Sequence, residues 1–397
     1  MTEAFTQALA ALDRGDLGAL HTAVRDHPDV LTERVEEEDD TYGGYFHGAT
    51  LLQHAAGNPY RGVLPDNMVE IARFLIDAGA DHHATCGGGP KQPDTAGGNL
   101  LGLVASSGHA AMRGLAKPLI DLLIEKGATF GDDAGVLFSA LYHTVECKLQ
   151  RDVGRYLYER GANADVVFAA ALGERELVDS MFNADGSLTP QGRGQWRGDY
   201  DTRSARSDQQ IIQEALLWAC MNGQSAMIDP LLTRGATING LASVSRWQIT
   251  PLHGAAWGGW PETCAWLLER GADHSIVDAV EQATPIGWAT YCKRTDVMEL
   301  FRLRCYSSLT LADAMEIGDE HQVAMALDQI DDVDAPPPGI EAGRGVLLRV
   351  AAYSGREEVV KLLLDRGADP AQTNRDGVSA RDIAAKQGHD SIVEMLS

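Results

Sequence analysis

Basic side chains are scarce in this chain of 397 residues. Lysine and arginine total 33 against 57 aspartates and glutamates, which leaves a formal net charge of −24. Nucleic acids and anionic membrane surfaces are bound largely through basic side chains that displace counterions or attract acidic headgroups. The sequence therefore predicts a protein that binds neither nucleic acid nor a membrane.

Cysteine pairs, long apolar runs and cofactor motifs are missing as well. The six cysteines form no Cys-x-x-Cys half-site for zinc. No stretch approaches the ~18 apolar residues of a membrane helix, and the first residues lack the basic and apolar regions of a secretory signal. No phosphate loop, dinucleotide fingerprint or serine-nucleophile motif occurs. We expect a cytoplasmic protein with no metal and no cofactor.

What the chain has instead is a recurring Gly-Ala-polar triplet. Each copy follows apolar residues at helical spacing, and glycine suits the left-handed residue that ends a helix because it has no Cβ. The intervals of 34 residues from Gly127 to Gly161 and 36 from Gly235 to Gly271 indicate a repeat architecture. The triplets begin at Gly79, Gly127, Gly161, Gly235, Gly271 and Gly367.

A second, slimmer helix precedes the apolar one. Its clearest copy is Thr250-Pro251-Leu252-His253-Gly254-Ala255-Ala256, in which proline takes the first helical turn, where its missing N–H does no harm. Weaker copies begin at Thr50, Thr284 and Leu347, and tight turns follow at Gly223, Gly259, Gly355 and Gly388. This combination resembles the ankyrin-repeat family, in a bacterial-type form.

The resemblance implies an all-α fold, a solenoid of about ten helix-turn-helix units with an N-terminal helical cap. Because a solenoid buries its core between neighbouring units, we predict a single domain over residues 1–397. Within it the predicted parts are a cap at 3–30, repeats at 49–182, a long insertion at 183–211, repeats at 212–330 and C-terminal repeats at 346–396.

The resemblance also implies where a partner binds. In ankyrin units the two residues after the Ala-Ala pair, and the tip of the turn before the slim helix, line a concave groove. Several of these positions are aromatic or Met, which the centres of interfaces favour. We therefore expect a partner protein or peptide in the groove, with binding residues Phe46, Asn58, His143, Met221, Asn222, Trp247, Trp257, Tyr291 and Tyr353.

An enzyme or small-molecule binder is the alternative. In that interpretation the insertion 183–208 covers the groove and contributes Trp196, Arg197 and Tyr200. A carboxylate beside an imidazole could perform acid–base chemistry, which makes His47, His54 and Asp40 the catalytic candidates. His54 could equally be a core histidine, and the aromatic residues could be ordinary core under the insertion.

Three other residues are predicted to be structural. The resemblance implies that His253 joins neighbouring turns by hydrogen bonds. Trp218 and Trp288 lie one residue before the Ala-Ala position, where side chains pack against the next repeat.

Overall fold

The computed structural model divides by contacts into two compact units, Met1–Pro251 and Leu252–Ser397, which we describe separately. The structure describes residues 1–35, 47–57, 64–86, 98–130, 135–145, 147–194, 206–244, 247–281, 283–305, 311–317, 320–328, 330–335, 344–374 and 376–397. Whether residues 1–397 form one continuous solenoid stays a prediction.

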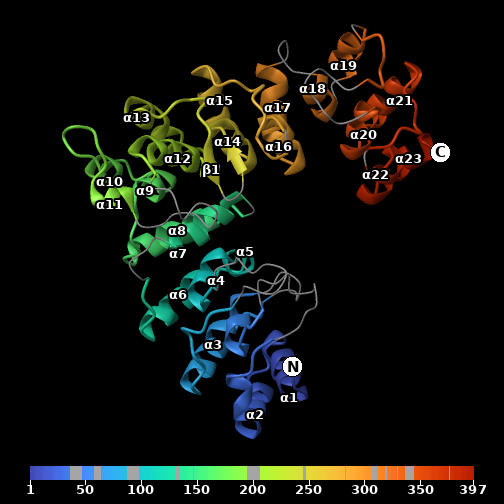
Figure 1. Cartoon of the computed structure of the whole chain (residues 1–397). Coiled ribbons are helices and arrows are strands. Elements are labelled where there is room, and N and C mark those ends of the chain that lie inside the picture. Colours follow the sequence, from blue (N-terminus) through green and yellow to red (C-terminus); the bar gives the residue numbers. More distant parts are fainter. Residues whose placement is uncertain are drawn as a thin grey trace. The chain divides into compact units, whose positions relative to one another are not determined.

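Unit 1 consists mainly of helical pairs, each with an inner and an outer member (Figure 1). The inner members are α1 (Glu3–Asp13), η3 (Leu51–Ala56), α4 (Leu100–Ser106), α7 (Gly135–Tyr142), α9 (Val166–Leu172) and α12 (Asp208–Met221). The outer members are α2 (Leu17–Asp26), α3 (Met68–Asp77), α6 (Ala116–Glu125), α8 (Gln150–Glu159), α10 (Arg175–Ser180) and α13 (Ile228–Thr233). Each inner member contacts the next inner member along the chain.

Short elements connect the two members of a pair or one pair to the next. They are η1 (Pro28–Leu31), α5 (Gly108–Met112), η4 (His143–Val145), α11 (Pro190–Arg193), η5 (Ser225–Met227), β1 (Ala242–Val244) and β2 (Trp247–Ile249). The two strands pair antiparallel, with Ala242 opposite Ile249, and form the one sheet within the described ranges. The chain is therefore predominantly helical, as predicted.

Two inner helices of unit 1, α9 and most of α12, are covered on all sides. Every residue of α9 is buried, and so are residues Ile211–Met221 of α12. Trp218 is fully buried, with the Phe168 ring edge-on at 5.4 Å and the Phe138 ring at 5.5 Å. The prediction that Trp218 belongs to the core is confirmed.

Unit 2 repeats the same two-layer plan (Figure 1). Its inner helices are α14 (Pro251–Gly258, which begins at the unit boundary), α16 (Pro285–Tyr291), α18 (Leu311–Ile317), α20 (Val346–Tyr353) and α22 (Ala380–Gln387). Its outer helices are α15 (Pro261–Glu269), α17 (Thr295–Arg304), α19 (Glu320–Leu327), α21 (Glu357–Asp365) and α23 (Asp390–Met395). The helices α18 to α23 share one apolar core that includes Ala351, Val360, Leu363 and Ile392.

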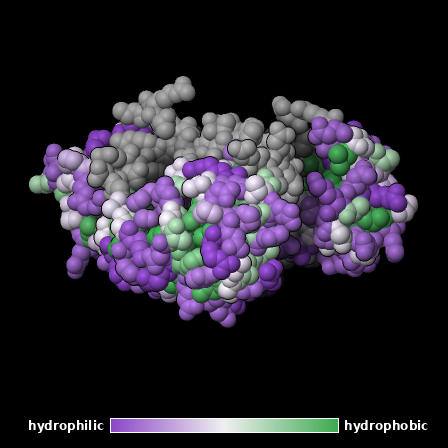
Figure 2. Space-filling view, turned by 90° about the horizontal axis from the view of Figure 1, so that it is seen from below, coloured by the Kyte–Doolittle hydropathy of each residue, from purple (hydrophilic) through white to green (hydrophobic). Residues whose placement is uncertain are grey.

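The face drawn in Figure 2 is mainly hydrophilic, and hydrophobic side chains appear on it as small separate patches. No helix within the described ranges has the length and apolar character needed to cross a bilayer.

Polar side chains of inner helices join successive repeats. The fully buried His253 donates from Nε2 to the Ala283 carbonyl at 3.0 Å. At the same motif position in an earlier repeat, Gln53 donates from Nε2 to the carbonyls of Ala84 (2.9 Å) and Gly98 (3.2 Å). The structural role predicted for His253 is confirmed, and glutamine performs the same task without a titratable group.

Because His253 can titrate and Gln53 cannot, the stability of the fold is predicted to depend on pH through His253. Burial lowers the pKa of His253 to about 4, against the opposing effects of the Ala283 hydrogen bond and Asp278. Between pH ~6.5 and ~4 the unfolded chain therefore takes up a proton that the folded chain refuses, and stability falls as pH falls, by up to about 3 kcal/mol.

We expect His253→Gln to keep the bond to Ala283 and to abolish this part of the acid sensitivity. Urea unfolding of the wild type and the variant at neutral pH and near pH ~4.5 measures the difference. Equal losses of stability in both proteins would contradict the assignment. His253→Leu serves as the control that loses the hydrogen bond at every pH.

Candidate functional site

Several residues predicted from the sequence lie outside the described residues. They are Asp40, Phe46, Asn58, Trp196, Arg197 and Tyr200. The enzyme hypothesis, in which the insertion covers the groove, depends on several of these residues. Of its other candidates, the structure describes His47, His54 and the two ends of the insertion.

The candidates of unit 1 are largely enclosed. His54 is 2% exposed and meets the Phe5 ring edge-on at 6.5 Å, so it belongs to the core, which was the structural alternative. His47 and Trp247 are half-buried, on the turn before η3 and on β2. His143 is also half-buried and donates from Nδ1 to the Ser139 carbonyl at 2.8 Å.

Met221 and Asn222 are fully buried, which corrects the expectation that they face an open groove. The helix α12 begins at Asp208 and packs against α9. The Asn222 amide donates to the Trp218 carbonyl at 3.0 Å, and Arg151 from α8 donates to the Asn222 carbonyl at 3.3 Å. Packing by α9 and a cross-repeat arginine thus enclose this turn, which the spacing alone could not reveal.

In unit 2 the groove candidates are accessible. Tyr291 ends α16 with 72% of its surface exposed, and Tyr353 ends α20 at 41%. Trp257, at the position of Tyr291 in the preceding repeat, is half-buried because its ring meets that of Trp288 at 5.0 Å. The structure therefore groups Trp257, Trp288 and Tyr291 on two consecutive inner helices.

The turn before α16, residues Asp273–Glu281, is held by one carboxylate and is called the finger below. Asp278 is fully buried and accepts hydrogen bonds from the N–H groups of Val280 (2.8 Å), Glu281 (2.7 Å) and Ala283 (3.1 Å). Its Oδ2 also accepts from the Trp288 indole at 2.9 Å. The finger and the Trp288 ring are thus attached to the same group.

Burial alone would raise the pKa of Asp278, but the hydrogen bonds from Trp288 and the three N–H groups outweigh it and hold the pKa below its ordinary value. Asp278 is therefore ionised at neutral pH. On this fixed turn Val277 and Val280 stand 42% and 46% exposed.

Beside Tyr291 the backbone has an unusual conformation. Lys293 has φ +55° and is the only non-glycine residue with a positive φ in the described part of the chain. Its N–H bonds to the Thr290 carbonyl at 3.0 Å, as the Gly259 N–H bonds to Ala256 at 3.1 Å one repeat earlier. Glycine adopts this conformation freely, whereas a residue with a Cβ does so at a cost of about 1 kcal/mol.

Sequence reasoning selected Tyr291 and missed Lys293 and Asp278. The signal for Lys293 was available, because the tight turn of this repeat lacks the glycine found at positions 259, 355 and 388. Asp278 offered no such signal, because an aspartate in a turn is common and only its burial shows its role.

Two family models match the chain. The model described as Ankyrin repeat matches residues 247–279, and the model described as Ankyrin repeats (many copies) matches residues 348–397. The chain contains ankyrin repeats over these two ranges. The first match contains α14, α15 and the start of the finger, so the candidate surface begins in a repeat that the family model itself identifies.

Individual proteins resemble the chain over part of its length. A Danio rerio protein named "Putative palmitoyltransferase ZDHHC13" is 26% identical over 213 residues, which cover 50% of this chain. The matched region is 31% of that protein, so the chain spans about a third of this curated relative. The human ASB11 ankyrin repeat domain, known from its crystal structure, is 24% identical in sequence. The structural match covers 59% of this chain and 98% of that chain, with a TM-score of 0.35.

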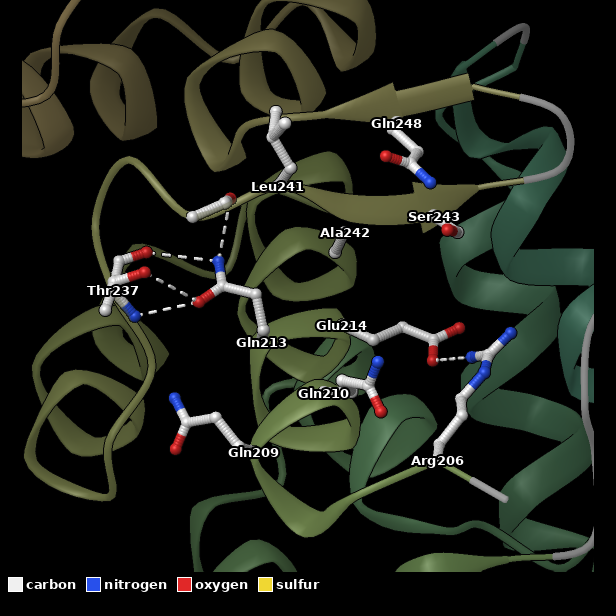
Figure 3. A pocket seen from close by; sticks show the side chains of 11 residues that line it. Arg206, Gln209, Gln210, Gln213, Glu214, Thr237, Leu241, Ala242, Ser243 and Gln248 are labelled. Carbon is white, nitrogen blue, oxygen red and sulfur yellow. Dashed lines mark hydrogen bonds and ion pairs between the residues drawn. The ribbon is translucent and has the colours of Figure 1, made fainter. Parts of the chain in front are cut away.

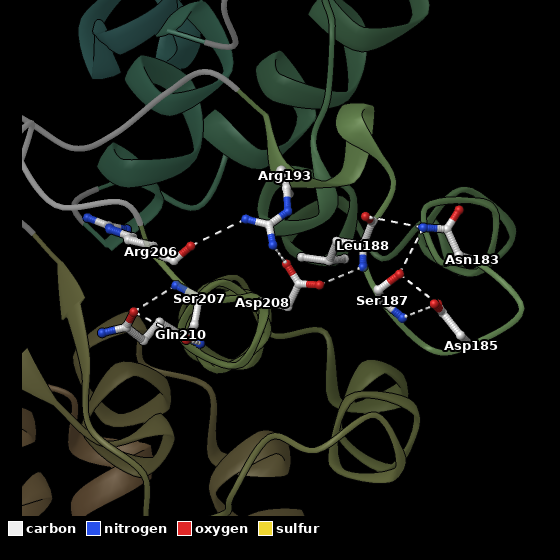
Figure 4. Close-up of polar contacts among 9 residues, drawn as sticks. All are labelled: Asn183, Asp185, Ser187, Leu188, Arg193, Arg206, Ser207, Asp208 and Gln210. Carbon is white, nitrogen blue, oxygen red and sulfur yellow. Dashed lines mark hydrogen bonds and ion pairs between the residues drawn. The ribbon is translucent and has the colours of Figure 1, made fainter.

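A second feature interrupts the helical pairs of unit 1. The described ends of the insertion are tied together (Figure 4): Asp208 accepts from the Leu188 N–H at 2.9 Å and pairs with Arg193. Arg193 also donates to the Arg206 carbonyl at 3.4 Å. The insertion thus leaves and re-enters the repeats through a folded base, and α12 begins at Asp208 inside the predicted insertion.

A polar cavity of about 510 Å³ lies next to this base, between α12 and the β1–β2 hairpin (Figure 3). Much of its polar lining already serves the fold. Gln213 donates to the carbonyls of Thr237 (3.1 Å) and Gly240 (2.9 Å), and Arg206 pairs with Glu214. The lining residues include no histidine and no cysteine. The cavity has amide and hydroxyl groups that can form hydrogen bonds with a small polar ligand.

The Arg206–Glu214 pair is deeply buried, with 13% and 6% of the side chains exposed. Removing one member of such a pair leaves an uncompensated charge, which typically costs about 3–5 kcal/mol, whereas replacing both by apolar residues is often neutral. We expect Glu214→Leu to destabilise the protein strongly and Arg206→Met with Glu214→Leu to restore most of the loss. Urea denaturation of the single and double variants measures both effects. A double variant as unstable as the single one would show that the pair does not act as a unit.

Proposed function

We propose that unit 2 binds a segment of a partner protein on the surface formed by Trp257, Tyr291, Lys293 and the finger, called the Tyr291 surface below. Ankyrin repeats suggest protein–protein interaction, and solenoids present extended surfaces for it. The observation that carries the proposal is the exposure of Tyr291, 72%, on an inner helix of the repeat stack.

The rigidity of the surface supports this proposal. Tyrosine offers a large contact area with little side-chain entropy to lose, which makes it a frequent anchor at interfaces. Trp288 joins α16 to the finger and to α14. Its indole donates to the buried carboxylate of Asp278, and its ring packs against Trp257. A surface that is ordered before binding loses less conformational entropy when the partner arrives.

The enzyme alternative finds no comparable support. His54 lies in the core against Phe5, where a substrate cannot reach it without rearrangement. The cavity of unit 1 lies next to the folded base of the insertion, but its ion pair and glutamine already hold structural partners. A binding function therefore accounts for more of the described features.

We expect Tyr291→Ala to weaken binding by about 2 kcal/mol, roughly thirtyfold in Kd, and to leave the melting temperature nearly unchanged. The probe is a set of peptides selected on the full wild-type chain from a phage-displayed library of random dodecapeptides. Titration calorimetry measures their Kd and differential scanning calorimetry measures stability. Leu303→Ala is the matched control, because Leu303 is 66% exposed on the outer helix α17.

Trp257→Ala separates anchoring from packing. Because the Trp257 ring packs against Trp288, we expect this variant to lose stability as well as affinity. Peptides that bind wild type and Tyr291→Ala equally well would refute the proposal.

A further inference from the structure

We infer that Lys293 determines the specificity of the Tyr291 surface, and that it selects partner segments with an aspartate or glutamate beside the residue that contacts Tyr291. This inference rests on the proposed function. It adds the chemistry of the partner: an apolar or aromatic side chain next to one carboxylate, in a segment that is otherwise neutral or basic.

The conformation of Lys293 is imposed by the repeat. In this turn the Arg294 N–H bonds to the Ala289 carbonyl at 2.7 Å. The same bond recurs in other repeats, from Trp260 to Ala255 at 3.0 Å and from His389 to Ala384 at 2.9 Å. Those repeats have Gly259 and Gly388 in the left-handed position, with φ +71° and +77°. Lysine therefore replaces glycine in a turn that the repeats with Gly259 and Gly388 close in the same way.

The Lys293 side chain does nothing for the fold that would explain its presence. It is exposed, and it forms no hydrogen bond or ion pair with any other described residue. Two arginines of the following helix α17 have carboxylate partners, Arg304 with Glu269 and Arg302 with Glu299. A cation held two residues from the exposed Tyr291, in a strained backbone and without such a partner, is available to a ligand.

Charge complementarity defines the partner. An ammonium group two residues along the chain from an exposed ring favours a carboxylate near an apolar side chain. The net charge of −24 repels a strongly acidic partner at long range, but salt screens this field beyond about 10 Å, whereas a direct ion pair persists at contact. One carboxylate in an otherwise neutral or basic segment satisfies both conditions.

The test uses the full chain and the peptides selected on the wild type. We expect an acidic residue next to an aromatic or large aliphatic residue to be enriched in these peptides. Lys293→Gly should bind them about fivefold to tenfold more weakly, and Lys293→Arg should bind like the wild type. Because glycine adopts the left-handed conformation without strain, Lys293→Gly should also raise the melting temperature.

Gly388→Lys is the matched control. An added Cβ at Gly388 meets no atom within 4 Å, so the variant adds only left-handed strain. We expect it to lower the melting temperature and to leave peptide binding unchanged. This result would show that the strain is real and that an arbitrary lysine in such a turn does not improve binding.

The outcomes separate the two proposals. If Tyr291→Ala weakens binding and Lys293→Gly does not, the surface binds partners but Lys293 does not select them, and the inference is overturned alone. If neither variant changes binding, the proposed function fails as well. If Lys293→Gly lowers the melting temperature, lysine stabilises the turn and its presence needs no ligand, which also overturns the inference.

Discussion

The Tyr291 surface depends on one buried carboxylate. Without partners, an ionised Asp278 in the interior would destabilise the fold by several kcal/mol. Three backbone N–H groups and the Trp288 indole compensate for this, and all four lie between Val280 and Trp288, in the end of the finger and the start of the repeat that follows it. Since Trp288 packs on Trp257, the same carboxylate indirectly positions the inner helix of the preceding repeat. Removing the charge would therefore weaken the hold on the finger and on the Trp288 ring together.

Elsewhere in the chain, hydrogen bonds from inner-helix side chains to the next turn also join neighbouring repeats. His253 and Gln53 occupy one motif position and both donate to carbonyls of the following turn. Gln213, from the longer helix α12, donates to the turn at 237–240. Each bond joins only neighbouring elements, as expected for a repeat protein whose stability is a sum of local and nearest-neighbour terms. The side chain can therefore vary between repeats as long as it donates a hydrogen bond at that place.

The sequence predicted the features that depend on local pattern. The Gly-Ala triplets indicated helix ends, and the buried Trp218 and the bridging His253 followed from their register in the repeat. It failed where distant segments decide exposure: Met221 and Asn222 are enclosed by α9 and by Arg151, which lies 71 residues from Asn222. Lys293 was missed for a different reason: the glycines that are present define the pattern, and the turn at Lys293 departs from it by having a lysine in the glycine position. The role of Asp278 needed coordinates, because an aspartate in a turn is ordinary until its burial is known.

The chemistry of the surface and the stability of its support share one range of pH. The Asp278 pKa lies below that of an ordinary aspartate, so its stabilising effect is complete above pH ~4 and is lost as pH falls through the folded-state pKa. His253, which bonds to the carbonyl of Ala283, resists protonation down to about pH 4 while the unfolded chain does not. A carboxylate on a partner also ionises near pH ~4. As pH falls below ~4, acid would therefore neutralise the partner carboxylate that Lys293 attracts. The finger loses the support of Asp278 in the same range. The surface is therefore both intact and selective only above this range.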